Sequence, residues 1–189
     1  MKVYIIRHGE SETNLAKRWT GWHDVHLTEK GRSDAKRVGE LLKSISFDRI
    51  YSSDLIRAVE TAVGAIPGCE IYEKTELLRE VNVGSLANQP LSVVDGEAKA
   101  RIRDCGYSDF GGETQEEFRA RIREFQSMLE TLPCDNVAVF SHAGWLVGFL
   151  NEVVGFYLPR SKVACNNCAV GVFEFNDGDW RLFSWLNLD

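Results

Sequence analysis

The stretch Val3-Tyr4-Ile5-Ile6-Arg7-His8-Gly9-Glu10 decides the fold of this 189-residue chain. Its first four residues are apolar, β-branched or aromatic without interruption, which is typical of a strand buried on both faces. Four polar or flexible residues follow at once, as expected where a buried strand ends in a functional loop. Residues 3–10 therefore predict the first strand of an α/β fold, followed at its carboxyl end by a loop with functional residues.

Strand and helix patterns then alternate along the chain. Apolar residues at helical spacing predict helices over about residues 28–45, 55–66, 114–132 and from 144 onward. Thr28 is a good N-cap for the first helix, and Thr114 with Glu117 forms a capping box at the start of the third. Further strands are expected at 50–52, 70–74, 136–141, 169–175 and 180–188, and an Asp-Gly turn joins the last two as a hairpin.

This order predicts a three-layer sandwich, in which a mostly parallel central sheet is covered by helices on both faces. We expect a single domain over residues 1–189, with residues 81–112 as a candidate lid insertion. In such folds, ligands bind at the carboxyl ends of the strands. Two loops occupy such positions: Arg7-His8-Gly9-Glu10 after the first strand, and His142-Ala143-Gly144 after the strand that ends at Ser141.

The charge of the chain excludes some classes of partner. The sequence holds 22 Lys and Arg against 28 Asp and Glu, a formal net charge of −6, and 44% of its residues are hydrophobic. Disordered and fibrous classes do not fit this composition. Nucleic acid is not expected as a partner, because its binding needs a basic surface. Residues 1–66 hold 11 basic and 9 acidic residues, so the negative charge lies wholly in the later part of the chain.

The remaining composition points to a reducing compartment. No apolar run is long enough for a signal segment or a membrane span, so we expect a cytoplasmic protein without a membrane partner. Five cysteines, an odd number, indicate reduced thiols. The single CxxC, Cys165-Asn166-Asn167-Cys168, lacks a second ligand pair and is interpreted as ordinary thiols. His23-Asp24-Val25-His26 could be drawn as a zinc site, but we interpret it as solvated loop side chains.

Two of the four histidines, His8 and His142, fall at the strand ends that the fold rule selects. Imidazole is largely neutral near pH 7, and nearby arginines lower its pKa, so a ring nitrogen keeps a lone pair for attack on phosphorus. The planar guanidinium groups of Arg7 and Arg57 match phosphate oxygens two at a time. These residue types favour phosphoryl transfer.

Six blocks in order along the chain closely resemble the histidine phosphatase superfamily, in its phosphoglycerate-mutase-like branch. The blocks are Arg7-His8-Gly9-Glu10 with Asn14; Thr20-Gly21-Trp22-His23-Asp24 with Leu27-Thr28 and Gly31; Ser53-Asp54-Leu55 with Arg57-Ala58 and Thr61-Ala62; Leu78-Arg79-Glu80 with Gly84; Gly112-Glu113-Thr114; and Ser141-His142-Ala143-Gly144.

The resemblance implies a role for each matching residue. His8 corresponds to the histidine that accepts the phosphoryl group, and Glu80 to the general acid and base. Arg7, Arg57 and His142 correspond to the pocket that stabilises the transferring group. The positions that contact substrate oxygens are matched by Asn14, Thr20, Gly21 and the backbone N–H of Ala143. The resemblance implies no metal or other cofactor, and a small phosphorylated metabolite as the partner.

The sequence departs from the family pattern after Gly84, where Ser85-Leu86-Ala87-Asn88 replaces the usual aromatic residue, Glu and Gly. We expect this altered stretch to line the mouth of the site and to affect specificity. Ala143 stands where Gly is usual, but its backbone N–H remains. The oligomeric state is left open by the sequence.

Three functions stay in competition. Mutases of this branch carry a long insertion between the equivalents of Glu80 and Gly112, and here the gap is short, which favours a metal-independent phosphatase acting through phosphohistidine on His8. Basic residues in the gap, at Lys99, Arg101 and Arg103, keep a cofactor-dependent phosphoglycerate mutase as the alternative, although a solvated helix is the preferred interpretation of them. A non-catalytic phosphate-binding protein is the third.

Overall fold

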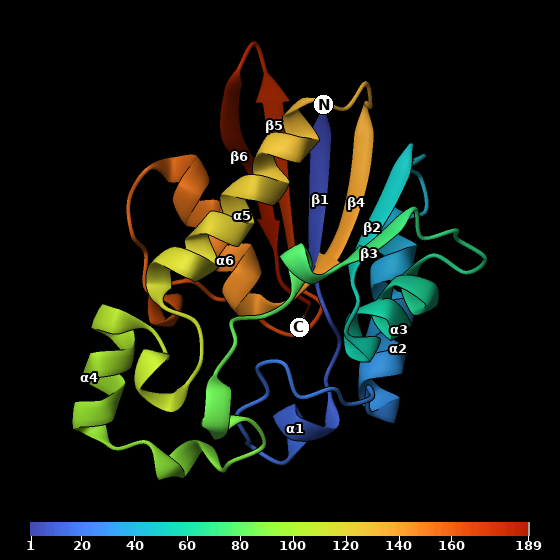
Figure 1. Ribbon diagram of the computed structural model, residues 1–189. Helices are drawn as coiled ribbons and strands as arrows, with labels where there is room; N and C mark the ends of the chain where they lie inside the picture. The colour runs from blue at the N-terminus through green and yellow to red at the C-terminus, as the bar shows by residue number, and fades with distance from the viewer. Residues whose placement is uncertain (189) are drawn as a thin grey trace.

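Six strands form one sheet in the computed structural model, which describes residues 1–188 (Figure 1). The strands are β1 (Lys2–Arg7), β2 (Arg49–Ser53), β3 (Glu73–Thr75), β4 (Asn136–Ser141), β5 (Val170–Asn176) and β6 (Asp179–Leu186), in the spatial order β3-β2-β4-β1-β5-β6. The first four in that order are parallel, and β5 and β6 are antiparallel to their neighbours. The expected mostly parallel sheet with a closing hairpin is confirmed.

Helices cover both faces of the sheet, so the predicted three-layer architecture is confirmed. They are α1 (Glu12–Leu15), α2 (Glu29–Leu42), α3 (Ile56–Ala65), α4 (Gly96–Cys105), α5 (Gln115–Glu130) and α6 (Ala143–Val154). Five short 3₁₀ turns accompany them: η1 (Glu76–Leu78), η2 (Gly84–Leu86), η3 (Leu91–Val93), η4 (Ser108–Phe110) and η5 (Arg160–Lys162). Among residues 1–188, no helix is long and apolar enough to cross a bilayer.

Strand alternation sends successive side chains of the sheet to two separate cores. Val3 and Ile5 of β1 pack with the helices α5 and α6, whereas Ile6 packs with α2 and α3. Phe125 of α5 meets the ring of Trp145 of α6 at a centroid distance of 5.6 Å. Both cores consist of buried, closely packed apolar side chains, which hold the carboxyl ends of the strands in fixed positions.

Most local predictions are confirmed, and the differences have physical causes. Thr28 caps α2, and Thr114 with Glu117 makes both bonds of the capping box at α5. Helix α2, the first helix expected from the sequence, ends at Leu42 rather than near residue 45. Strand β3 begins at Glu73 rather than residue 70, because only Glu73–Thr75 pair with β2.

The inner face of α3 differs from the apolar stripe expected over residues 55–66. Val63 is 52% exposed, whereas Arg57 and Thr61 are fully buried. The helix turns this polar pair toward the carboxyl ends of the strands, where both side chains find hydrogen-bond partners. The predicted face is confirmed at Leu55, Ala58 and Ala62, which are buried, and is wrong at Val63.

The segment 81–112 has a small core of its own beside the loop that follows β1 (Figure 1). Backbone hydrogen bonds join the two, from Trp19 N to Gln89 O at 2.9 Å and from Asn88 N to Trp19 O at 2.7 Å. The expectation that residues 85–88 line the mouth is wrong. Leu86 is buried in the small core, and the wall of the site takes Val81, Val83 and Tyr107 from this segment instead.

Candidate active site

Parallel strands β1 and β4 bring the two predicted histidines together. Arg7 and Ser141, the last residues of these strands, lie in register, and His8 N donates to Ser141 O at 2.9 Å. His142 follows as the N-cap of α6. The two imidazole rings meet edge to face with centroids 5.1 Å apart, although 133 residues separate them along the chain.

The hydrogen bonds of His8 set its tautomer. Nδ1 lies 2.7 Å from Gly9 O, which can only accept, so Nδ1 carries the hydrogen and Nε2 keeps its lone pair. Arg57 Nε donates to Nε2 at 3.3 Å. Burial, with the positive charges of Arg57 and Arg7, holds the pKa of His8 well below its ordinary value. The ring is therefore a neutral nucleophile at pH 7.

Arg57 joins α3 to the loop that contains Gly21. Its Nη2 donates to Gly21 O at 2.8 Å and its Nη1 to His23 O at 3.0 Å. Burial lowers the pKa of Arg57 to about 10, so the guanidinium stays charged at neutral pH. Gly21 has φ +51°, and an added Cβ would lie 2.5 Å from Val83, so glycine is required at this turn.

Arg7 is a buried cation with capacity left for a ligand. Its Nη1 donates to Cys165 O, while its Nε is buried without a hydrogen-bond partner among the described residues. Burial lowers the pKa of Arg7, and the neighbouring charge of Arg160 lowers it further. An anion would relieve both the unpaired N–H and the repulsion between the two guanidinium groups.

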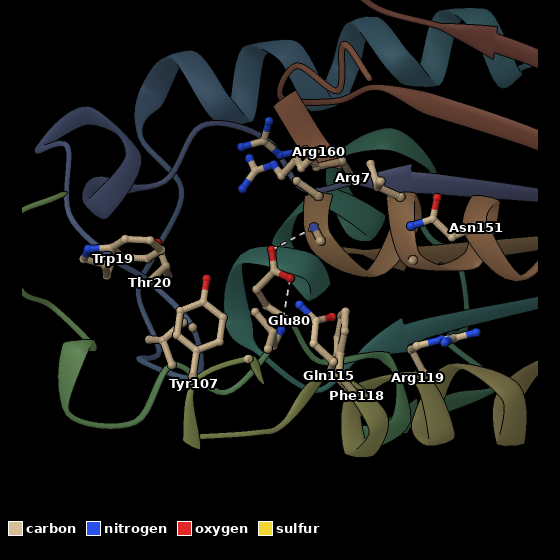
Figure 2. A pocket seen from close by; sticks show the side chains of 18 of the residues that line it. Arg7, Trp19, Thr20, Glu80, Tyr107, Gln115, Phe118, Arg119, Asn151 and Arg160 are labelled. Carbon is tan, nitrogen blue, oxygen red and sulfur yellow. Dashed lines mark hydrogen bonds between the residues drawn. The ribbon is translucent and has the colours of Figure 1, made fainter. Parts of the chain in front are cut away.

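Glu80 is held at the N-terminus of α6. Gly144 N donates to Oε2 at 3.0 Å and Val81 N donates to Oε1 at 3.0 Å, and both bonds are drawn in Figure 2. A Cβ on residue 144 would stand 2.2 Å from Oε1, so this glycine makes room for the carboxylate. These two backbone N–H groups fix the orientation of the Glu80 carboxyl group.

His142 lies against His8 and not on the wall of the cavity. Its Nε2 is 2.9 Å from Ser53 Oγ, and its Nδ1 is buried without a partner among residues 1–188. Burial and the charge of Arg57 hold the pKa of His142 well below its ordinary value. The neutral ring therefore keeps one ring nitrogen without a partner in the described part of the chain, next to the ring of His8.

A cavity of about 600 Å³ opens above these residues. Eight of the nine site residues selected from the sequence line it: Arg7, His8, Asn14, Thr20, Gly21, Arg57, Glu80 and Ala143. The structure adds residues that the sequence did not select individually, among them Trp19, Tyr107, Phe118, Tyr157, Arg160 and Asn167. No motif marks the added residues, because they come from segments whose position depends on packing.

Arg160 and Tyr107 belong to opposite walls of this cavity. Figure 2 shows Arg160 beside Arg7 on one side and Tyr107 on the other, with Glu80 between them. Burial, together with the charge of Glu80, raises the pKa of Tyr107 to about 12, so its hydroxyl remains a donor. Asn167 Nδ2 donates to His8 O at 3.3 Å and to Asn14 Oδ1 at 3.1 Å, which ties the loop before β5 to the nucleophile.

The basic residues considered for substrate binding in a mutase, and the histidines considered for a zinc site, take no part in the cavity. Lys99, Arg101 and Arg103 are on α4 and do not line the cavity, and Arg101 pairs with Asp109. His26 Nδ1 lies 2.7 Å from Glu60 Oε1. Among the side chains that the structure describes, no three His, Cys, Asp or Glu residues are grouped so that they could hold a metal ion.

Comparison with known proteins assigns the family. The family model described as histidine phosphatase superfamily (branch 1) matches residues 3–188. The chain belongs to this superfamily. It is 30% identical to the Photorhabdus laumondii protein named "Probable phosphoglycerate mutase GpmB", over 98% of this chain and 90% of that protein. Members of the superfamily are enzymes, and so is this chain.

Solved structures of this superfamily share the fold over their whole length. YhfR from Bacillus stearothermophilus has a TM-score of 0.86 and 28% sequence identity, with 96% of this chain and 94% of that chain covered. TTHB049 from Thermus thermophilus has a TM-score of 0.78 and 28% identity, with 100% of each chain covered. The fold of this chain is therefore shared with known structures over 96% or more of its length.

Proposed function

We propose that this histidine phosphatase superfamily member is a phosphatase, which hydrolyses small phosphomonoesters through a phosphohistidine on His8. The observation that carries the proposal is the state of His8: a neutral ring with Nδ1 bonded to Gly9 O and an Nε2 lone pair beside Arg57 and Arg7. A nucleophile of this kind needs no base to activate it.

In the first step, His8 Nε2 attacks the phosphorus and the ester P–O bond breaks. The departing oxygen takes the electron pair of that bond and receives a proton from the carboxylic acid form of Glu80. Arg7, Arg57 and the free Nδ1 of His142 stand around His8 and stabilise the charge on the equatorial oxygens. The products are phosphohistidine and a neutral alcohol.

In the second step, water attacks the phosphorus and the P–N bond breaks. The Glu80 carboxylate takes a proton from the water, and the electron pair returns to Nε2. Inorganic phosphate leaves and both residues regain their starting states. In both steps, the guanidinium groups of Arg7 and Arg57 supply the positive charge that stabilises the transferring phosphoryl group.

Phosphoglycerate mutase activity is the second candidate, and the name of the Photorhabdus laumondii relative favours it. A mutase must keep water from phosphohistidine. In this chain, 31 residues separate Glu80 from Gly112, and some of them form one wall of the cavity. The rest of the cavity mouth carries exposed side chains. This open mouth supports hydrolysis over retention of the phosphoryl group.

Brief incubation with an aryl phosphate, followed by acid-free mass spectrometry, tests the proposal. We expect a base-stable, acid-labile phosphoryl group on His8, absent from His8→Ala, and release of inorganic phosphate that persists with a chelator. Phosphate on another residue contradicts the covalent scheme. Transfer between the hydroxyls of phosphoglycerate, faster than release of phosphate, identifies a mutase instead.

A further inference from the structure

Glu80 stands on a segment that has no regular hydrogen-bond ladder of its own. Residues 79–83 follow the 3₁₀ turn η1 and belong to no helix or strand. Irregular backbone in a protein interior needs donors from elsewhere for its carbonyl groups. The donors that this segment uses therefore decide how well Glu80 is fixed.

One side chain, Arg121 of α5, donates both to this segment and to the 3₁₀ turn before it. Its Nη1 donates to three carbonyl oxygens, those of Glu76 at 3.2 Å, Leu77 at 2.9 Å and Arg79 at 3.1 Å. Its Nη2 donates to the carbonyl oxygen of Glu80 itself at 3.2 Å. A planar guanidinium can hold four carbonyls in this way because its donors are arranged in a rigid fork.

The same guanidinium also fixes the chain beyond Glu80. Arg121 Nε donates to Glu113 Oε1 at 2.8 Å and Nη2 to Glu113 Oε2 at 2.9 Å. Glu113 Oε2 then accepts from Asn82 N at 2.7 Å. Trp22 adds a second donor to Glu80 O at 2.7 Å from the loop after β1. The backbone is thus held on both sides of Glu80.

Arg121 does this without touching the cavity. Only 15% of its side chain is exposed, and it is absent from the residues that line the cavity. Its nitrogens already donate to protein groups, and its guanidinium also lies 5.2 Å from the ring of Phe118 on the cavity wall. Among the groups that it holds by hydrogen bonds, Glu80 is the one with a role in the proposed reaction. We infer that Arg121 is a positioning residue that holds Glu80 where it can protonate the leaving group and later deprotonate the water.

This inference rests on the proposed function and makes a narrower claim, which leaving-group chemistry tests. A nitrophenolate leaves without a proton, whereas the alkoxide of glycerol phosphate needs one. We expect Arg121→Ala to lower kcat for glycerol phosphate by about 100-fold, the usual contribution of a general acid, and kcat/KM for 4-nitrophenyl phosphate only slightly. The KM for glycerol phosphate should stay nearly unchanged, whereas the KM for 4-nitrophenyl phosphate should fall together with its kcat, because hydrolysis of phosphohistidine becomes the slow step.

The second chemical step supplies an independent readout. With 4-nitrophenyl phosphate, Arg121→Ala should still form phosphohistidine, but hydrolysis slows because the displaced Glu80 no longer takes the proton from water. Phosphoenzyme then accumulates to a higher level than in the unsubstituted protein, which rapid quenching measures. Added guanidinium chloride, far below the concentrations that unfold proteins, should partly restore activity by occupying the vacated site.

Arg123→Ala is the matched control, because it removes a guanidinium from the same helix. Arg123 pairs with Glu116 on the exposed surface, away from the cavity. We expect it to behave as the unsubstituted protein. If Arg121→Ala unfolds at low temperature, Arg121→Lys carries the test, since it keeps the charge and loses the fork.

Equal losses of kcat/KM with the two substrates overturn the positioning role of Arg121. The absence of phosphoenzyme accumulation in Arg121→Ala overturns it as well. Failure of the proposed function has a different signature, because phosphate would then be missing from His8 in the unsubstituted protein as well. The two outcomes are therefore separated in one series of measurements.

Discussion

The floor and the rim of the cavity are built in different ways. The floor consists of Arg7, His8 and Arg57, which are buried at the ends of packed elements. The rim consists of side chains such as Tyr157, which is 58% exposed, and Arg160, which has no ion-pair partner among the described residues. Packing fixes the floor, whereas the rim is free to meet a ligand.

This difference assigns different work to the two regions. Buried charges interact strongly with a bound phosphoryl group because water does not screen them. Their positions are also set before the substrate binds. Exposed charges act weakly and are easily screened. We therefore expect substitutions in the floor to act on kcat and substitutions in the rim to act on KM and on the choice of substrate.

The largest effect is expected from His8→Ala. Removing the nucleophile should lower kcat by about 10⁴-fold or more, because the covalent route is lost while binding by the arginines remains. Release of inorganic phosphate from an aryl phosphate measures it. Activity retained within tenfold would move the nucleophile to another residue.

A smaller loss is expected when Glu80 is displaced without being removed. Gly144→Ala would place a Cβ 2.2 Å from Glu80 Oε1, so the carboxylate must move away from the N-terminus of α6. We expect kcat for alkyl phosphates to fall by about 100-fold, as for Glu80→Gln. The control is kcat/KM of the same variant with 4-nitrophenyl phosphate, whose leaving group needs no proton and which should therefore be affected little.

The rim should respond mainly through KM. Arg160→Ala removes a cation beside Arg7, and we expect KM to rise by about tenfold at low salt with kcat changed little, as for the loss of one charged contact. Arg160→Lys should recover part of the affinity. A large fall in kcat with unchanged KM would instead place Arg160 in the floor, in contact with the transferring phosphoryl group.

The smallest expected effect concerns pH and stability. The pKa values of His8 and His142 lie well below the ordinary value in the folded chain, so the fold keeps both rings neutral. In the unfolded chain imidazole takes a proton below about pH 6.5, which favours unfolding. Stability should be full above that pH and fall by about 2–3 kcal/mol by about pH 5.5, since each of the two rings contributes about 1.4 kcal/mol. Denaturant unfolding at the two pH values measures it, and His142→Asn should reduce the fall.

Local residue patterns predicted much of the framework. The run Val3–Ile6, the capping box at Thr114 and the Asp-Gly turn each encode their structure within a few residues, and each is found where it was expected. The strand-end rule also selected both histidines. These features depend on steric preference and local hydrogen bonding, which neighbouring residues determine.

Other features depended on contacts between distant segments. Nothing near Val63 shows that its side of α3 faces solvent, and nothing near Leu86 shows that it enters a small separate core. Arg160 reaches the cavity because the loop after α6 returns to Arg7. No periodic pattern contains such information, so the expectation for residues 85–88 was wrong.

The sequence by itself determined the α/β order, the family and the identity of the floor, since the reactive residue types stand at strand ends and those ends must share one edge of the sheet. Only the tertiary structure decided which nitrogen of His8 is free, how Arg121 holds the segment around Glu80, and which side chains form the rim. Those properties arise from the directions of hydrogen bonds between segments far apart in the chain. Such directions exist only once the two cores have packed.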